Sequence, residues 1–141
     1  MKVPIDHYAS GEYLYHQMVF PVCQQYELTH MEFTVLMFLA NNPRFDTAAQ
    51  IVKYRRLTKS HVSLAVRSLL ERKLLLGEDG KEDRRTIHLK ITENAAPIIA
   101  DGRTVQNQFY EILFEEFTPE ERETMAQFMN RIDENIKNHI V

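Results

Sequence analysis

The chain has 141 residues and a formal net charge of −3. Hydrophobic residues make up 44% and charged residues 26%, a composition that excludes wholesale disorder and is ordinary for a soluble globular protein. No apolar run reaches the roughly 18 residues that span a bilayer, residues 1–7 lack the apolar stretch of a signal peptide, and a single cysteine, Cys23, excludes an intrachain disulfide. We therefore expect one domain in the cytoplasm, with no membrane partner.

The charges are unevenly distributed along the chain. Between Lys53 and Lys90 there are 11 basic and 5 acidic residues, a net charge of +6, whereas the rest of the chain carries −9. A basic segment in an acidic chain is typical of a localised surface that binds a polyanion. A solvated charged face is the alternative, and the charges alone do not decide between the two.

Helical periodicity and capping signals predict the first three helices. A first helix runs from about residue 4 to residue 25, and Pro21 is expected to kink it or to begin a new turn. The sequence Thr29-His30-Met31-Glu32 is a capping box that opens an apolar helix, which Asn41-Asn42-Pro43 closes. Asp46 is expected to cap a short third helix over residues 47–54.

The period of the pattern then changes from helical to alternating. After the link Arg55-Arg56-Leu57, Thr58 is a candidate N-cap for a helix over residues 59–72. Apolar and polar residues alternate strictly over residues 86–91, as in a half-buried strand, and residues 74–76 are a plausible partner strand. Residues 77–83 would form the charged loop of this hairpin.

Two long helices complete the predicted order. Thr92 is expected to cap a helix that continues to about Glu116, with bends at Pro97 and Gly102. The sequence Thr118-Pro119-Glu120-Glu121 is a second capping box, which opens the last helix. The predicted fold class is therefore α+β and mostly helical, with a helix-turn-helix and a β-hairpin in the middle of the chain.

This order of elements resembles the MarR family of multiple-antibiotic-resistance-type regulators, over most of the chain. The sequence Asp83-Arg84-Arg85 is similar to the Asp-x-Arg signature in the family's hairpin, or wing, and Ile91-Thr92 follows where the family has Leu-Thr. Residues 28–36 resemble the opening of the family's second helix, and residues 50–63 resemble its helix-turn-helix.

The chain departs from the family pattern at three glycine positions. Arg56 stands in the turn of the helix-turn-helix, Lys73 stands just after the recognition helix, and Ala95 stands early in the fifth helix. The position after the recognition helix is one where a left-handed cap is convenient, which is why glycine is usual there.

The resemblance implies a winged helix-turn-helix over about residues 29–91, between dimerisation helices over about 4–25 and 92–140, in one domain of residues 1–141. It implies a homodimeric, sequence-specific DNA-binding transcriptional regulator, and more specifically a repressor that a small-molecule effector releases from a palindromic operator. The apolar residues of the last two helices favour a dimer independently, since they exceed what one small core can bury. Packing of these helices on each other is the alternative.

A helix that enters the major groove of DNA needs short polar or basic residues near its N-terminal half. Arg67 is the best single candidate for a bidentate contact with guanine. By resemblance, Arg85 is the wing arginine that enters the minor groove, and Asp83 orients it. A solvated helix face and a hairpin whose charges pair among themselves are the alternatives. The full set of expected DNA-binding residues is Arg55, Arg56, Thr58, Lys59, Ser60, His61, Ser63, Arg67, Lys81, Arg84 and Arg85.

MarR-like proteins commonly bind small, often aromatic or anionic effectors between the dimerisation helices and the winged helix. The resemblance therefore implies an effector cleft, although aromatic residues at such places are more often part of the core. The residues compatible with this cleft are Tyr13, His16, Phe20, His30, Phe33, Phe45 and Arg103.

Enzyme and metal functions find little support in the sequence. There is no H-E-x-x-H, C-x-x-C, P-loop or G-x-S-x-G motif, so we expect neither an enzyme nor a cofactor. Zinc-binding members of the family carry histidines in the fifth helix, and this chain has none between His88 and His139, so no metal site is expected. Two other functions stay open: a winged-helix module that binds a protein or RNA, and a redox-responsive regulator based on Cys23.

Overall fold

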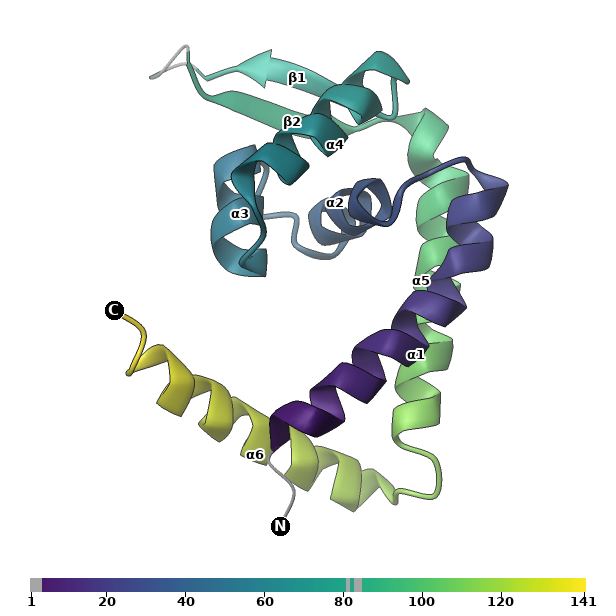
Figure 1. Cartoon of the computed structure of the whole chain (residues 1–141), viewed down its shortest axis with the longest axis vertical. Coiled ribbons are helices and arrows are strands. Elements are labelled where there is room, and N and C mark those ends of the chain that lie inside the picture. The colour runs from purple at the N-terminus through teal and green to yellow at the C-terminus, as the bar shows by residue number, and fades with distance from the viewer. Residues whose placement is uncertain (1–3, 81, 83–84) are drawn as a thin grey trace. The chain divides into compact units, whose positions relative to one another are not determined.

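The computed structural model of the chain describes residues 4–80, 82 and 85–141. Within these residues, Figure 1 shows a mostly helical protein with a two-stranded antiparallel sheet, which confirms the predicted fold class. No helix of the described residues is long and apolar enough to cross a membrane. In chain order the elements are α1 (Pro4–Gln25), α2 (His30–Asn41), α3 (Ala48–Arg55), α4 (Lys59–Glu71), β1 (Leu75–Asp79), β2 (Ile87–Ile91), the 3-10 helix η1 (Glu93–Ala95), α5 (Ala96–Leu113) and α6 (Pro119–Lys137).

The chain divides into two compact units, residues 1–106 and residues 107–141. The first unit holds α1 to α4, the hairpin and most of α5, and the second holds the end of α5 and all of α6. This division does not test the expected domain boundaries, so the single domain over residues 1–141 stays a prediction.

The core of the first unit forms around α2, which Figure 1 shows in the centre of this unit. Helix α2 is apolar on nearly all sides, and a helix of this kind is stable only where neighbours cover it completely. The neighbouring helices and the hairpin contribute their own apolar faces to the same core. The largest fully buried side chains are Val19, Phe33, Val35, Leu36, Ile51, Val62, Leu69 and Leu75.

The N-terminus of α2 confirms its predicted capping box, but the N-terminus of α3 corrects the predicted cap. Thr29 accepts a hydrogen bond from the Glu32 backbone N–H, and the Glu32 carboxylate accepts one from the Thr29 N–H, both at 3.1 Å. Helix α3 is capped by Thr47 in a capping box with Gln50, not by Asp46. The reason is that Asp46 lies one residue too early, where its carboxylate meets β2 instead.

The hairpin is longer than the alternating pattern predicted. Strand β1 continues to Asp79, and its residues Leu75 to Asp79 pair in antiparallel register with Ile91 to Ile87. Residues 77–79, which we expected in the loop, therefore belong to the strand. Leu75 and Leu89 are buried on one face, while the charged Glu78 is exposed, which a two-stranded ribbon with one solvated face tolerates.

Two of the departures from the family's glycine pattern occupy left-handed backbone. Arg56, the C-cap of α3, has φ of 53°, and Lys73, just after α4, has φ of 58°. A side chain at such φ costs roughly 1 kcal/mol, which explains why glycine is usual at these positions. The surrounding bonds hold the turn after α4, since Leu74 N–H donates to the carbonyl of Leu69 at 2.9 Å.

The start of α5 also differs from the prediction. Thr92 makes no capping hydrogen bond, because its hydroxyl donates instead to the Lys73 carbonyl at 2.6 Å, and η1 precedes α5. Gly102, where we expected a bend, lies inside the continuous helix α5. A Cβ on Gly102 would lie 2.6 Å from the Met37 sulfur, so glycine is needed here for the close approach of α5 to α2.

The second unit contains the predicted last helix. Thr118 and Glu121 form the expected capping box of α6, with Pro119 at the first helical position. Arg122 donates two hydrogen bonds of 3.1 Å to the Glu111 carboxylate and one to the Phe114 carbonyl, which fixes the turn between α5 and α6. No residue of α6 is buried in the chain.

Candidate nucleic-acid interface

Helix α4 presents its predicted DNA-binding residues to solvent. Its buried residues Val62, Ala65, Val66 and Leu69 fall on one side, which packs against α2 and α3. The expected DNA-binding residues from Thr58 to Arg67 are all exposed, and helical geometry places Ser60 and Arg67, seven residues apart, on the same face. The exposed residues of this set are Thr58, Lys59, Ser60, His61, Ser63 and Arg67.

Leu64, for which the sequence predicted no role, also lies on this exposed face of α4. Its side chain is 59% exposed, although it is a leucine in a helix with a clear apolar side. The signal was available: Leu64 is out of phase with Val62, Ala65, Val66 and Leu69, about half a turn from the centre of the buried face.

The turn between α3 and α4 carries two of the expected phosphate contacts. Arg55 and Arg56 are both exposed, and the Leu57 N–H donates to the Val52 carbonyl at 3.2 Å to close the turn. The left-handed conformation of Arg56 lets the chain reverse between the two helices within three residues. Both guanidinium groups are thus free of the core and available to a polyanion.

In the wing, the structure describes residues 75–80, 82 and 85–91. Arg85 is exposed at the start of the returning strand segment. Lys81, Asp83 and Arg84 lie outside the described residues, so the expected orientation of Arg85 by Asp83 stays a prediction.

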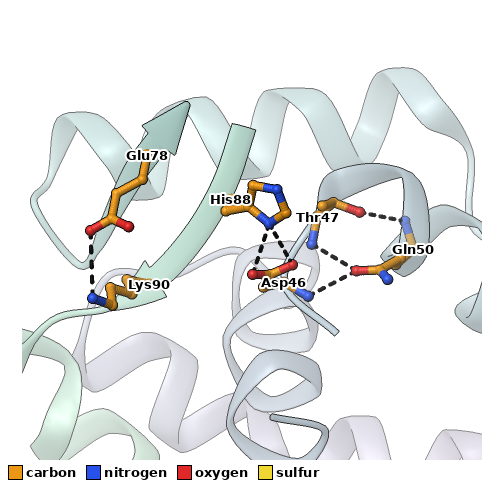
Figure 2. Close-up of polar contacts among 6 residues, drawn as sticks. All are labelled: Asp46, Thr47, Gln50, Glu78, His88 and Lys90. Carbon is orange, nitrogen blue, oxygen red and sulfur yellow. Dashed lines mark hydrogen bonds and ion pairs between the residues drawn. The ribbon is translucent and has the colours of Figure 1, made fainter. Parts of the chain in front are cut away.

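Strand β2 of the wing is tied to the start of α3 through His88 and Asp46, as Figure 2 shows. The Nδ1 of His88 lies 2.9 Å from both carboxylate oxygens of Asp46, and the Leu89 N–H donates to the Asp46 carbonyl at 2.7 Å. The Asp46 N–H in turn donates to the Gln50 side chain at 2.9 Å. These bonds couple the position of β2 to the N-terminus of α3, so the wing and the helix-turn-helix are positioned together.

A buried carboxylate connects α2 with the far end of α4. Glu32, 6% exposed, accepts a hydrogen bond from the Ser68 hydroxyl at 2.9 Å, and its Oε2 lies 3.7 Å from Arg72 Nη1. Arg72 also donates to the carbonyls of Tyr26 and Glu27, at 2.7 and 3.0 Å. Helix α4 is therefore held to the α1–α2 junction by a polar network as well as by apolar packing.

The seven residues expected around an effector cleft differ in their surroundings, and their role in such a cleft stays a prediction. His16 and His30 stack with ring centroids 3.6 Å apart, and burial together with His16 and Arg55 lowers the pKa of His30. Phe33 is buried in the core, and Phe45 stacks on Tyr54 with ring centroids 4.3 Å apart.

The remaining three of these seven residues are Tyr13, Phe20 and Arg103. Arg103 donates to the Ala40 carbonyl, and Tyr13 and Phe20 are exposed on α1. Of the seven, His16 and His30 are the two that the structure brings into ring contact.

The environment of Cys23 counts against the redox-responsive alternative. The residue is 6% exposed, and burial, with a smaller effect of Glu32, raises the pKa of its thiol to about 11. Reactive sensor cysteines are accessible and have lowered pKa values. Among the described residues, no group of three or more histidine, cysteine or acidic side chains could hold a metal ion.

Comparisons with known proteins agree with this geometry. The family model described as MarR family matches residues 26–86. The chain is 25% identical over 126 residues to the transcriptional regulator ZitR of Lactococcus lactis, with 86% of each chain covered. A MarR family transcriptional regulator from Listeria monocytogenes, solved with 26mer DNA, aligns with a TM-score of 0.83 and 15% identity over 98% of this chain and 91% of that chain.

A further similar structure is that of BpsR from Bordetella bronchiseptica, a protein whose DNA binding is regulated by 6-hydroxynicotinic acid. It aligns with a TM-score of 0.70 and 18% identity, over 93% of this chain and 99% of that chain.

The fold is that of a winged helix-turn-helix protein, and the chain is similar over most of its length to transcriptional regulators. The MarR family model matches the part of the chain that holds the helix-turn-helix and much of the hairpin. The named relatives are transcriptional regulators and not enzymes, in agreement with the lack of enzyme motifs in the sequence.

Proposed function

We propose that the protein is a homodimeric repressor that binds a palindromic DNA operator and is released from it by a small effector. The observation that carries this proposal is the exposed polar and basic face of α4 beside an arginine-bearing hairpin. In this arrangement α4 enters the major groove, Arg85 enters the adjacent minor groove, and Arg55 and Arg56 contact phosphates. The Listeria monocytogenes relative with 26mer DNA supports duplex DNA as the ligand.

The dimer is supported by apolar side chains that the single chain leaves exposed. On α1 these are Ile5, Tyr8, Tyr13 and Phe20, and on α6 they begin with Phe128 and recur at helical spacing. A monomer that exposed such stripes to water would be prone to association. A second copy that covers them also supplies the second recognition helix that a palindrome requires. The exposed large apolar residues of α6 are Phe128, Met129, Ile132 and Ile136.

The effector is proposed to be a small aromatic or anionic molecule. The regulation of BpsR by 6-hydroxynicotinic acid supports an aromatic acid as the chemical class. The His16–His30 stack joins α1 to α2, so a molecule that separated or extended this stack would act on the helices that position α4. A shift in those helices changes the spacing of two recognition helices in a dimer and hence the affinity for DNA.

The decisive experiment is selection of bound sequences from random duplex DNA, followed by binding measurements at several salt concentrations. We expect a palindromic motif and an affinity that falls as salt rises, because phosphate contacts release counterions. The double variant Arg84→Ala plus Arg85→Ala should reduce the slope of log affinity against log salt by about one to two units for each half-site. Enrichment of no duplex motif, with binding to RNA or to a protein instead, would favour the alternative winged-helix module.

Base reading is tested with Arg67→Ala on the selected operator and on its single-base variants. We expect a loss of about 1–3 kcal/mol on the operator and a much smaller loss where the contacted base pair has been changed. Arg131→Ala, which removes an exposed arginine from α6, is the matched control and should leave the preference unchanged. A uniform loss across all sequences would show that Arg67 contacts phosphate only.

A further inference from the structure

Leu64 stands in the middle of the face of α4 that the proposed function turns toward DNA. It follows Ser60 by four residues and precedes Arg67 by three, spacings that make these side chains neighbours on a helix surface. The face opposite, with Val62, Ala65, Val66 and Leu69, is already buried in the core. Leu64 is therefore the apolar member of an otherwise polar surface, with 59% of its side chain exposed.

A leucine at this place has a definite consequence for the bases that α4 can accept. Leucine neither donates nor accepts a hydrogen bond, so any polar group it covers loses its bonds to water without replacement. The base edges of the major groove offer hydrogen-bond donors and acceptors, and the C5 methyl group of thymine is the apolar group that projects into the groove. A leucine between two residues that reach base edges therefore favours thymine at the position it meets and disfavours the other bases.

We propose that Leu64 is a specificity-determining residue that packs against the C5 methyl group of a thymine in each half-site. This inference rests on the proposed function, since it requires α4 to lie in the major groove. In that position Leu64 buries its side chain against the methyl group, while Ser60 and Arg67 form hydrogen bonds to the neighbouring base edges or phosphates. The exposed leucine thus contacts an apolar group of the DNA, and a hydrogen-bonding side chain in its place would not favour this contact.

The test replaces each thymine of the selected operator, one symmetric pair at a time, by deoxyuridine, which lacks only the methyl group. We expect one pair of positions at which the wild-type protein binds about fourfold more weakly for each half-site, the effect of one lost buried carbon. In Leu64→Ala the same replacement should change the affinity by less than twofold. Leu64 is exposed, so the variant should retain the helical circular dichroism spectrum and unfolding midpoint of the wild type.

Leu76→Ala is the matched control. Leu76 is a leucine of similar exposure, 56%, on β1. We expect this variant to keep the full sensitivity to deoxyuridine, because its side chain lies on the hairpin and not on α4.

The possible results separate the inference from the function on which it rests. Tight operator binding with no deoxyuridine effect at any position, or an effect that persists in Leu64→Ala, overturns the role of Leu64 alone. A selected motif that has no preferred thymine in its half-sites likewise overturns the role of Leu64 alone. Failure to select any duplex overturns the proposed function and the role of Leu64 with it.

Discussion

At the scale of the residue, burial decides which side chains are available for chemistry. Cys23 packs in the core next to Val19 and Val22 of the same helix, and its thiol pKa is raised to about 11 from an ordinary value of 9.0. At pH 8 the ionised fraction of the Cys23 thiol is therefore about a hundredfold lower in the folded protein than in the unfolded chain. Low exposure reduces access further.

We therefore expect iodoacetamide to alkylate Cys23 at least about a hundredfold more slowly in the folded protein than in guanidinium chloride at pH 8. Mass spectrometry of timed samples measures the two rates. Mild peroxide should leave operator binding unchanged in both the wild type and Cys23→Ser. Rapid alkylation of the folded protein, or loss of binding on oxidation that Cys23→Ser abolishes, would restore the redox-responsive alternative.

Helix α4 shows how far the position of single residues could be predicted from the sequence. The residues Ser60, Ser63 and Arg67, which we expected to face DNA, lie exposed on α4, while the apolar residues at helical spacing are buried. Leu64 was missed because apolar residues are sought on the buried side, and its exposure follows only from its angle around the helix. Roles in DNA binding stay predictions, since exposure does not identify what a side chain binds.

At the scale of the element, the capping boxes at Thr29 and Thr118 were predicted, whereas the box at Thr47 was missed and the cap expected at Thr92 was wrong. The boxes at Thr29 and Thr118 carry both partners within four residues, so the sequence contains the whole interaction. Thr92 was expected to cap a helix, but its hydroxyl bonds to the carbonyl of Lys73, 19 residues away. A partner so distant in the chain is set by tertiary packing, which local patterns do not contain.

The two capping boxes differ in their surroundings, and this difference predicts different energies. Glu32 is buried and bonds to Ser68 as well as to the Thr29 backbone, whereas Glu121 is exposed and serves the cap alone. We expect Glu32→Ala to lower the free energy of unfolding by about 1–3 kcal/mol, because it removes the carboxylate that accepts from the Thr29 N–H and leaves the Ser68 hydroxyl without its partner.

The matched control is Glu121→Ala, for which we expect a loss of about 0.5–1 kcal/mol. Glu32→Gln should fall between the wild type and Glu32→Ala, since the glutamine oxygen can still accept from the Thr29 N–H and its amide can donate to the Ser68 hydroxyl, but the side chain carries no charge for Arg72. Urea unfolding followed by circular dichroism measures all three. Equal losses for Glu32→Ala and Glu121→Ala would show that the bond to Ser68 adds nothing to the stability.

At the scale of the whole molecule, the sequence predicted the order of elements but not the division into two units. The order follows from periods and caps, which are local. The division at residue 106 falls inside α5, where no glycine, proline or change of composition marks it. The division reflects how many apolar side chains are buried within the same chain. In residues 107–141 most of the large apolar side chains are exposed.

The exposed apolar stripe of α6 predicts how the dimer can be broken. Phe128 and Ile132 are four residues apart and 50% and 46% exposed, so they lie side by side on one face of the helix. We expect the double variant Phe128→Glu plus Ile132→Glu to convert a dimer of twice 16.6 kDa to a monomer at micromolar concentration, because burying two carboxylates against the apolar stripe of the partner is unfavourable. Sedimentation equilibrium measures the mass.

The control adds the same charge to the other side of the same helix. Gln127→Glu plus Asn130→Glu changes two exposed polar residues of α6 and should leave the dimer intact.

The monomeric variant should keep the fold of residues 1–106, because no residue of α6 belongs to the buried core, yet it should lose most of its affinity for a palindrome. A single recognition helix contacts one half-site only, and the binding energy of the second half-site is then lost. A wild-type protein that sediments as a folded monomer of 16.6 kDa at micromolar concentration would contradict the dimer, and with it the reading of a palindrome by two recognition helices.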